Sequence, residues 1–252
     1  MPPLAPVVRY GDHPEQVANL HLPAEEGGPW PAVVLLHGGF WRERWDRTLM
    51  TPLARDLARR GLVAWNVEYR RVGQAGGGWP GTLEDVAAAL DALADVAEVD
   101  PARVVAVGHS AGGQLALWLG ARRGGAVRLR GAVSLAGVCD LVRGDADRLG
   151  DGAVRGFLGA SVAEEPDRYA AASPAALLPL GVPQLLVHGG RDDVVPPSQS
   201  RDYAAAALAA GDDVELIELP EAGHEDVIDP AGPAWAAVRA WLVAPERVEP
   251  GA

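Results

Sequence analysis

The chain has 252 residues, 48% hydrophobic and 22% charged, a balance ordinary for globular proteins that excludes a disordered or fibrous chain. Its formal net charge of −12 argues against nucleic acid as a partner, because phosphate binding depends on concentrated Lys and Arg. All 22 basic residues are Arg, and the absence of lysine from the sequence excludes Schiff-base catalysis and a Ser-Lys dyad.

Strand-like and helix-like segments alternate along the sequence. Residues 7–10 and 16–22, joined through GDHP, predict an antiparallel hairpin at one sheet edge. Short apolar runs then predict buried parallel strands at 32–36, 62–67, 103–107, 131–135, 184–187 and 214–219. Ala-rich amphipathic stretches between them predict helices at 49–60, 82–96, 111–122, 198–210 and 234–242. This alternation is typical of a mostly parallel α/β sheet with helices on both faces.

Nothing in the sequence divides the chain, so a single domain over residues 1–252 is expected. The least regular region is 137–181, which is rich in Gly, Asp and Arg. An excursion of this length is expected either to form a small cap over the functional site or to run along the surface with short helices. Residues 245–252 are expected to form a loose tail.

Cysteine usage and hydropathy bear on the compartment. The single cysteine, Cys139, cannot form an internal disulfide and fits a reducing compartment. The N-terminal sequence MPPLAPVVRYG has no signal-peptide pattern, and no apolar stretch reaches membrane-spanning length. We therefore expect a cytoplasmic protein that does not act on a membrane. The sequence leaves open whether it is a monomer or a homodimer.

A G-x-S-x-G pentapeptide, GHSAG at residues 108–112, lies between a predicted strand and a predicted helix. The two glycines permit a sharp turn that lifts Ser110 into a strained conformation. The turn also points the helix N-terminus at the serine, so the N–H of Ala111 becomes a candidate donor to an oxyanion. Ser110 is therefore a candidate nucleophile, and the alternative is a serine that only caps the helix.

Other loops at the same sheet edge supply the groups that a nucleophilic serine needs. HGGFW directly follows the strand at 32–36, so the N–H groups of Gly39 and Phe40 are candidates for a second oxyanion donor. His37 itself is expected to bond loop backbone. Asp192 and Asp193 follow another strand, and one of them is expected to orient a histidine. His224, after the last strand, is the best placed base, and the order Ser110, Asp192, His224 is that of an α/β-hydrolase triad.

Candidate substrate contacts gather near this edge. Phe40, Trp41, Trp45 and Trp79 are expected either to line an aromatic or acyl pocket or to pack in the core. His109, the variable residue of the serine motif, is a further candidate. No metal site is expected, because the acidic residues after His224 lack ligand spacing and the run at 145–151 lacks the EF-hand pattern.

The elements HGGFW, GHSAGG, HGGRDDVVP and AGH resemble those of the α/β-hydrolase superfamily, in particular its esterases and arylformamidases with an HGG-x-W motif. The resemblance covers residues 32 to about 242. It implies an eight-stranded α/β-hydrolase fold, with Ser110 as nucleophile, His224 as base and Asp192, four residues before Pro196 in D-x-x-V-P, as acid. Phe40 stands where several formamidases have Tyr.

The resemblance implies a serine hydrolase that needs no cofactor and acts on a small-molecule ester or amide through an acyl-enzyme. The first hypothesis is a carboxylesterase for small or medium esters, aryl esters among them. The second is an arylformamidase or amidase that hydrolyses N-formylkynurenine-like substrates. The third is a non-catalytic binding protein on a hydrolase scaffold. The first two use the same residues, so the sequence does not separate them.

Overall fold

An eight-stranded sheet runs through the computed structural model, which describes residues 5–243. Its strand order is β1-β2-β4-β3-β5-β6-β7-β8. The strands are β1 (Val7–Arg9), β2 (Val17–His21), β3 (Trp30–Leu36), β4 (Val63–Val67), β5 (Val99–His109), β6 (Gly131–Leu135), β7 (Gln184–Gly189) and β8 (Val214–Leu219). The first two form the expected antiparallel hairpin, and β3 to β8 run parallel. The predicted mostly parallel sheet is confirmed; the tail at 245–252 lies outside the described residues.

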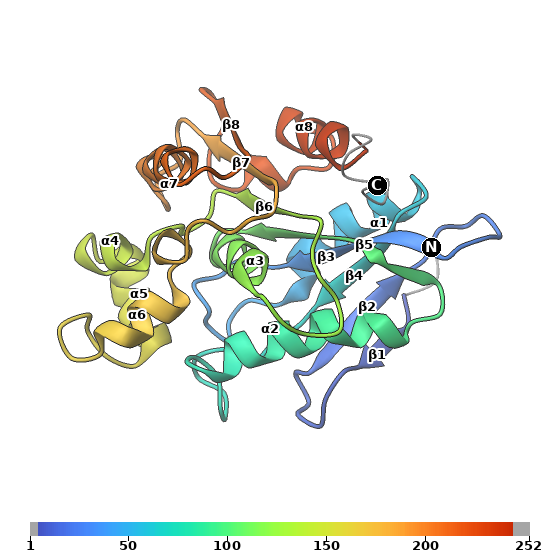
Figure 1. The fold of residues 1–252 in the computed structure, drawn as a ribbon, viewed down its shortest axis with the longest axis horizontal. Helices are drawn as coiled ribbons and strands as arrows, with labels where there is room; N and C mark the ends of the chain where they lie inside the picture. Colours follow the sequence, from blue (N-terminus) through green and yellow to red (C-terminus); the bar gives the residue numbers. More distant parts are fainter. Residues whose placement is uncertain (1–4, 244–252) are drawn as a thin grey trace.

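Helices cover both faces of the sheet (Figure 1). One face packs against α2 (Gly81–Asp91), α3 (Ala111–Ala121) and α7 (Ser198–Ala209), and the other against α1 (Thr51–Ala58) and α8 (Pro233–Leu242). Consecutive side chains of β3 point to opposite faces of the sheet. Val34 joins the core cluster of α2 and α3, while Val33 and Leu35 join that of α1 and α8. A parallel strand buried on both faces is apolar throughout, which explains the runs in the sequence.

Short 3-10 helices extend or follow several of these elements. They are η1 (Arg47–Met50), η2 (Ala92–Asp95), η3 (Pro174–Ala176) and η4 (Asp226–Ile228). The predicted helix at 82–96 is thus an α-helix that tightens into a 3-10 turn after Asp91. Within residues 5–243, no helix is both long enough and apolar enough to span a bilayer.

The irregular region between β6 and β7 is largely helical. It contains α4 (Leu141–Ala146), α5 (Leu149–Leu158) and α6 (Pro166–Ala172), which lie together at the left of Figure 1. The Asp140 carboxylate begins α4 by accepting from the N–H groups of Val142 at 2.9 Å and Arg143 at 3.1 Å. Phe157 and neighbouring apolar residues of α5 join the same core cluster as α3.

Backbone segments meet without intervening side chains where β5 passes into α3. A methyl group on Gly108 would overlap the carbonyl oxygen of Gly112, and one on Gly112 would overlap the carbonyl oxygen of Leu36. The end of β5, the first turn of α3 and the end of β3 are therefore in direct contact. This contact explains both glycines of the G-x-S-x-G pattern more fully than turn geometry alone.

Replacing Gly108 with alanine should lower the free energy of unfolding by about 3 kcal/mol, because backbone atoms on both sides must move to admit the methyl group. The matched control is Gly156→Ala, since Gly156 lies in α5 with open space around its Cα; that change should stabilise the protein by about 0.5–1 kcal/mol. Urea unfolding followed by circular dichroism measures both. Equal stability of Gly108→Ala and the wild type would contradict the packing described here.

Candidate active site

Ser110 lies in the turn between β5 and α3, with φ 55° and ψ −119°. A non-glycine residue at such positive φ costs about 1–3 kcal/mol and persists only where its surroundings impose it. Here the N–H of Ser110 donates to the carbonyl of Leu135 at 2.8 Å, which ties the turn to the end of β6. Ser110 as a whole is 2% exposed, so its hydroxyl group is largely sheltered from bulk water.

His224 and Asp192 form a direct pair. Nδ1 of His224, between β8 and η4, lies 2.7 Å from Oδ2 of Asp192, which follows β7. Oδ1 of Asp192 accepts from the N–H groups of Val194 at 2.9 Å and Val195 at 2.8 Å. Of the two candidate aspartates, Asp192 is thus the one beside His224, while Asp193 is exposed.

The surroundings of Asp192 favour its charged carboxylate form over the protonated form. Burial alone would raise its pKa, but the hydrogen bonds from His188 and His224 and from backbone N–H groups hold the pKa well below its usual range. Asp192 therefore remains a carboxylate over the whole neutral range. A carboxylate at Nδ1 keeps the proton of a neutral imidazole on that nitrogen, which leaves Nε2 of His224 as the basic atom.

Ser110 and His224 line the same cavity, of about 200 Å³. Its walls are mostly apolar, and Glu225 is the charged side chain among its lining residues within the described part of the chain. The lining residues are Gly39, Phe40, Trp45, Leu49, His109, Ser110, Val194, His224 and Glu225. A space of this size admits a small acyl group beside the serine.

The loop after β3 faces this cavity with its backbone. Gly39, Phe40 and Trp41 all have positive φ, at 111°, 53° and 55°. Within residues 5–243, the N–H groups of Gly39, Phe40 and Ala111 have no hydrogen-bond acceptor in the protein. A methyl group on Gly39 would overlap the side chain of Trp45, so the glycine is required by packing as well as by its φ. These N–H groups are therefore available to a bound anion.

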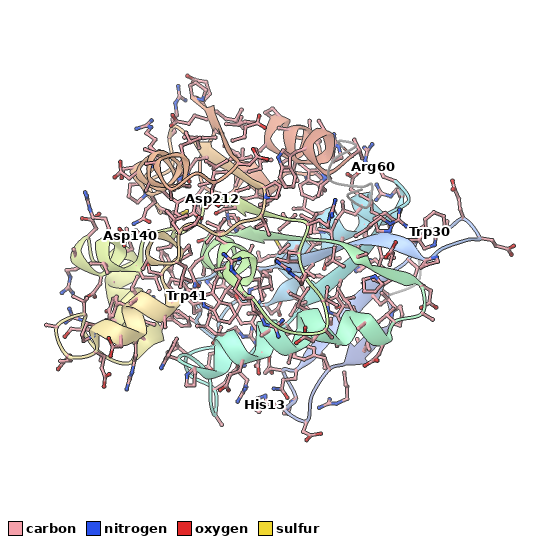
Figure 2. All side chains as sticks on the ribbon, in the orientation of Figure 1. His13, Trp30, Trp41, Arg60, Asp140 and Asp212 are labelled. Atoms are coloured by element: carbon pink, nitrogen blue, oxygen red, sulfur yellow. The ribbon has the colours of Figure 1, made fainter. Side chains whose placement is uncertain are left out.

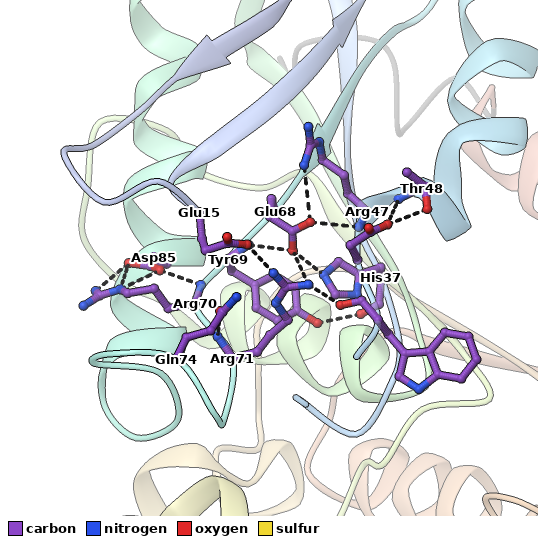
Figure 3. A network of polar contacts seen from close by, with 12 residues as sticks. Glu15, His37, Arg47, Thr48, Glu68, Tyr69, Arg70, Arg71, Gln74 and Asp85 are labelled. Atoms are coloured by element: carbon purple, nitrogen blue, oxygen red, sulfur yellow. Dashed lines mark hydrogen bonds and ion pairs between the residues drawn. The ribbon is translucent and has the colours of Figure 1, made fainter. Parts of the chain in front are cut away.

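A buried polar network fixes the base of this loop, and Glu68 lies at its centre (Figure 3). Oε1 of Glu68 lies 2.9 Å from Nε2 of His37 and 3.2 Å from the Arg71 guanidinium, and Oε2 accepts from the N–H of Arg47 at 3.1 Å. Burial would raise the pKa of Glu68, but His37 and the arginines lower it below its ordinary value. The sequence does not mark Glu68, because its role depends on contacts with His37 and Arg47, which lie in other segments of the chain.

Two further hydrogen bonds join the network to the loop backbone. The Tyr69 hydroxyl donates to the carbonyl of His37 at 2.8 Å, and the two rings stack at 4.4 Å. Nδ1 of His37 lies 2.7 Å from the carbonyl oxygen of Gly38, so His37 bonds loop backbone as expected. Arg71 also donates to the carbonyl of Trp45, so a residue that lines the cavity belongs to the same network.

His109 lies in the cavity wall beside His224. It is 2% exposed, and its Nε2 is 3.1 Å from the carbonyl oxygen of His224. Burial and the adjacent His224 lower the pKa of His109 to about 3. At neutral pH His109 is thus an uncharged ring that donates from Nε2 to the backbone of His224.

The aromatic residues near the edge divide between cavity and core. Phe40 and Trp45 line the cavity, but Trp41 and Trp79 are not among its lining residues. Trp41 is fully buried between α3 and α5 (Figure 2), with its indole N–H donating to Gln114 at 3.0 Å and its ring stacked on Phe157 at 4.6 Å. The structure therefore places Trp41 in the core, where contacts with α3 and α5 hold its side chain.

Three side chains of the kinds that bind metal ions do approach one another in the cavity wall. Nitrogen or oxygen atoms of His109, His224 and Glu225 lie within 4.8 Å of one another. Two of these residues already use ring nitrogens in protein contacts, His224 with Asp192 and His109 with the backbone of His224. Asp226 accepts from the N–H of Gly223 at 2.7 Å and so stabilises the turn that carries His224.

Comparisons with known proteins agree with this architecture. Esterase LipC of Mycobacterium tuberculosis is 27% identical over 261 residues, covering 93% of this chain and 64% of that protein. A probable isoprenylcysteine alpha-carbonyl methylesterase of Oryza sativa is 32% identical over 119 residues, covering 43% of this chain. The chain spans 26% of that relative, and so less than two thirds of either protein.

A solved structure of an esterase from Thermogutta terrifontis superimposes with a TM-score of 0.80 at 25% identity, covering 98% of this chain and 95% of that one. The expected α/β-hydrolase fold is therefore confirmed. The BD-FAE family model matches residues 18–207, about three quarters of the sequence. The chain belongs to the BD-FAE family.

Proposed function

We propose that this protein is a serine hydrolase that cleaves carboxylic esters of small or medium size, aryl esters among them. One observation carries the proposal: a strained serine and a carboxylate-bound histidine line one cavity, beside unoccupied backbone N–H groups. An acyl-transfer site needs a nucleophile, a base with its orienting acid, and donors for the oxyanion. Relatives that are named esterases support the ester as substrate.

Acylation begins when Nε2 of His224 takes the proton of the Ser110 hydroxyl group. The serine oxygen attacks the ester carbonyl, and the resulting oxyanion accepts hydrogen bonds from the N–H groups of Gly39, Phe40 and Ala111. Asp192 holds the ring in the required tautomer and stabilises its positive charge. The carbon–oxygen bond of the ester then breaks, and His224 gives its proton to the departing alcohol.

Deacylation repeats these steps with water. His224 takes a proton from a water molecule, the hydroxide attacks the acyl carbonyl, and the same N–H groups receive the oxyanion. The bond to Ser110 breaks, the serine oxygen regains its proton from His224, and the carboxylic acid leaves. Each proton removed is returned within the cycle, so these protein groups suffice for hydrolysis.

The helices between β6 and β7 are proposed to act as a cap beside this cavity, within one domain. The Arg42 guanidinium donates to the carbonyl of Gly150 at 2.5 Å, and Gly150 lies so close to the Phe40 ring that a methyl group there would overlap it. The cap therefore contacts the loop at residues 37–41, which carries the proposed oxyanion donors Gly39 and Phe40. A cytoplasmic location is proposed as well, because Cys139 is a buried free thiol.

Replacing Ser110 with alanine should lower kcat for p-nitrophenyl acetate on the order of 10⁶-fold, because no other group supplies the attacking oxygen. The melting temperature should not fall, since removal of the hydroxyl leaves the backbone contacts in place. Initial-rate kinetics and thermal unfolding on the same preparations measure both. A Ser110→Ala protein that keeps most of its activity would sink the proposal.

Ester and formamide substrates separate the two enzymatic hypotheses. Turnover of p-nitrophenyl acetate should exceed that of N-formylkynurenine at equal concentration, because relatives named esterases favour the ester and the cavity is small. Propionate, present in one structure of the Thermogutta terrifontis esterase, is an acid of fitting size. Faster hydrolysis of N-formylkynurenine would assign the site to an arylformamidase instead, and no turnover of either would favour a binding protein.

A further inference from the structure

A second histidine contacts the carboxylate of Asp192. His188, near the end of β7, is fully buried, and its Nε2 lies 3.2 Å from Oδ2 of Asp192 and 2.9 Å from the carbonyl oxygen of Val195. Oδ2 is the same oxygen that Nδ1 of His224 approaches at 2.7 Å. Two imidazole rings therefore share one carboxylate oxygen, and one of them has no part in the triad.

The hydrogen-bond partners of His188 determine its tautomer. A backbone carbonyl only accepts, so the contact with Val195 requires a hydrogen on Nε2 of His188. Nδ1 lies 2.7 Å from the hydroxyl oxygen of Ser200, a fully buried residue of α7. In the neutral ring Nδ1 is an acceptor, so the Ser200 hydroxyl donates to it. Ser200 thereby keeps the hydrogen of His188 on the side that faces Asp192.

We infer that His188 is a positioning residue that holds Asp192 and limits how strongly its carboxylate attracts the proton of His224. The inference rests on the proposed triad. Ser200, His188, Asp192 and His224 then form one continuous chain of contacts from α7 to the cavity. His188 does not touch the substrate, and it acts through Asp192.

Four N–H groups surround the carboxylate of Asp192, and the one on Nε2 of His188 is shared between Oδ2 of Asp192 at 3.2 Å and the carbonyl oxygen of Val195 at 2.9 Å. Val194 and Val195 donate to Oδ1, while His188 and His224 approach Oδ2. Loss of the His188 donor would leave more negative charge on Oδ2 for the protonated ring of His224. His224 would hold its proton up to a higher pH, and the acid limb of the pH–rate profile would move upward.

Other charged or titratable groups near His224 stay unchanged in this test. The His109 ring lies 4.7 Å from that of His224, and its pKa of about 3 keeps it neutral across the working range. Glu225 and Asp226 are exposed on the same turn. A movement of the acid limb on changing His188 therefore reports on the contact with Asp192.

His188→Asn and His188→Gln make a matched pair. The asparagine amide reaches only the Nδ1 position, beside Ser200, whereas the glutamine amide nitrogen reaches the Nε2 position, beside Asp192. The asparagine variant should lower kcat for p-nitrophenyl acetate about 10-fold, because Asp192 and with it His224 lose a fixed position. Its acid limb in kcat/KM should move upward by about 0.5–1 pH unit, and the glutamine variant should largely restore both.

Ser200→Ala keeps His188 and removes only the hydroxyl that donates to its Nδ1. It should move the acid limb in the same direction by a smaller amount, and this variant decides the matter if His188→Asn does not fold. A titration of the His224 ring by NMR gives the same comparison without substrate. Variants with lower melting temperatures but unmoved acid limbs and ring titrations would overturn the inference.

The activity of the wild-type protein distinguishes failure of the inference about His188 from failure of the proposed function. Wild-type activity that disappears in Ser110→Ala, together with unmoved acid limbs in both His188→Asn and Ser200→Ala, would overturn only the role of His188. A wild-type protein without Ser110-dependent ester hydrolysis would overturn the proposed function, and the role of His188 with it.

Discussion

Three backbone segments in direct contact hold the rest of the site in place. The ends of β3 and β5 and the first turn of α3 approach so closely that only glycine fits at positions 108 and 112. Because β3 continues into the loop at 37–41 and α3 begins at Ala111, this contact sets the distance between Ser110 and the N–H groups around it. Neither side can shift without the other, and the proposed oxyanion stabilisation requires this kind of preorganisation.

Two buried carboxylates connect the site to the strands and loops around it. Glu68 connects the loop at residues 37–41 to β4 and to two arginines. Asp192 connects His224 to the end of β7. Both are charged because hydrogen bonds outweigh the effect of burial on their pKa. A buried carboxylate satisfied on every side fixes its partners, whereas one left with a missing donor would destabilise the protein.

Much of this architecture could be predicted from the sequence because the strong signals are local. Apolar runs gave the parallel strands, and the strand-turn-helix context of GHSAG marked Ser110. Parallel strands end at one edge, so loops far apart in sequence could be assigned to one site. The sequence left open whether Trp41 lines the pocket or packs in the core, because the choice depends on contacts with Gln114 and Phe157, far along the chain. Glu68 and His188 were missed because their roles arise only from contacts between different elements.

The central claim is that Ser110 is the activated nucleophile, and covalent labelling tests it most directly. The wild-type protein would be treated with a fluorophosphonate probe, digested, and its modified peptide located by mass spectrometry. The account predicts a single adduct on Ser110, formed faster when the ring of His224 is neutral, because the neutral ring is the base that activates the serine. No adduct, or an adduct on another serine at comparable rate, would contradict it.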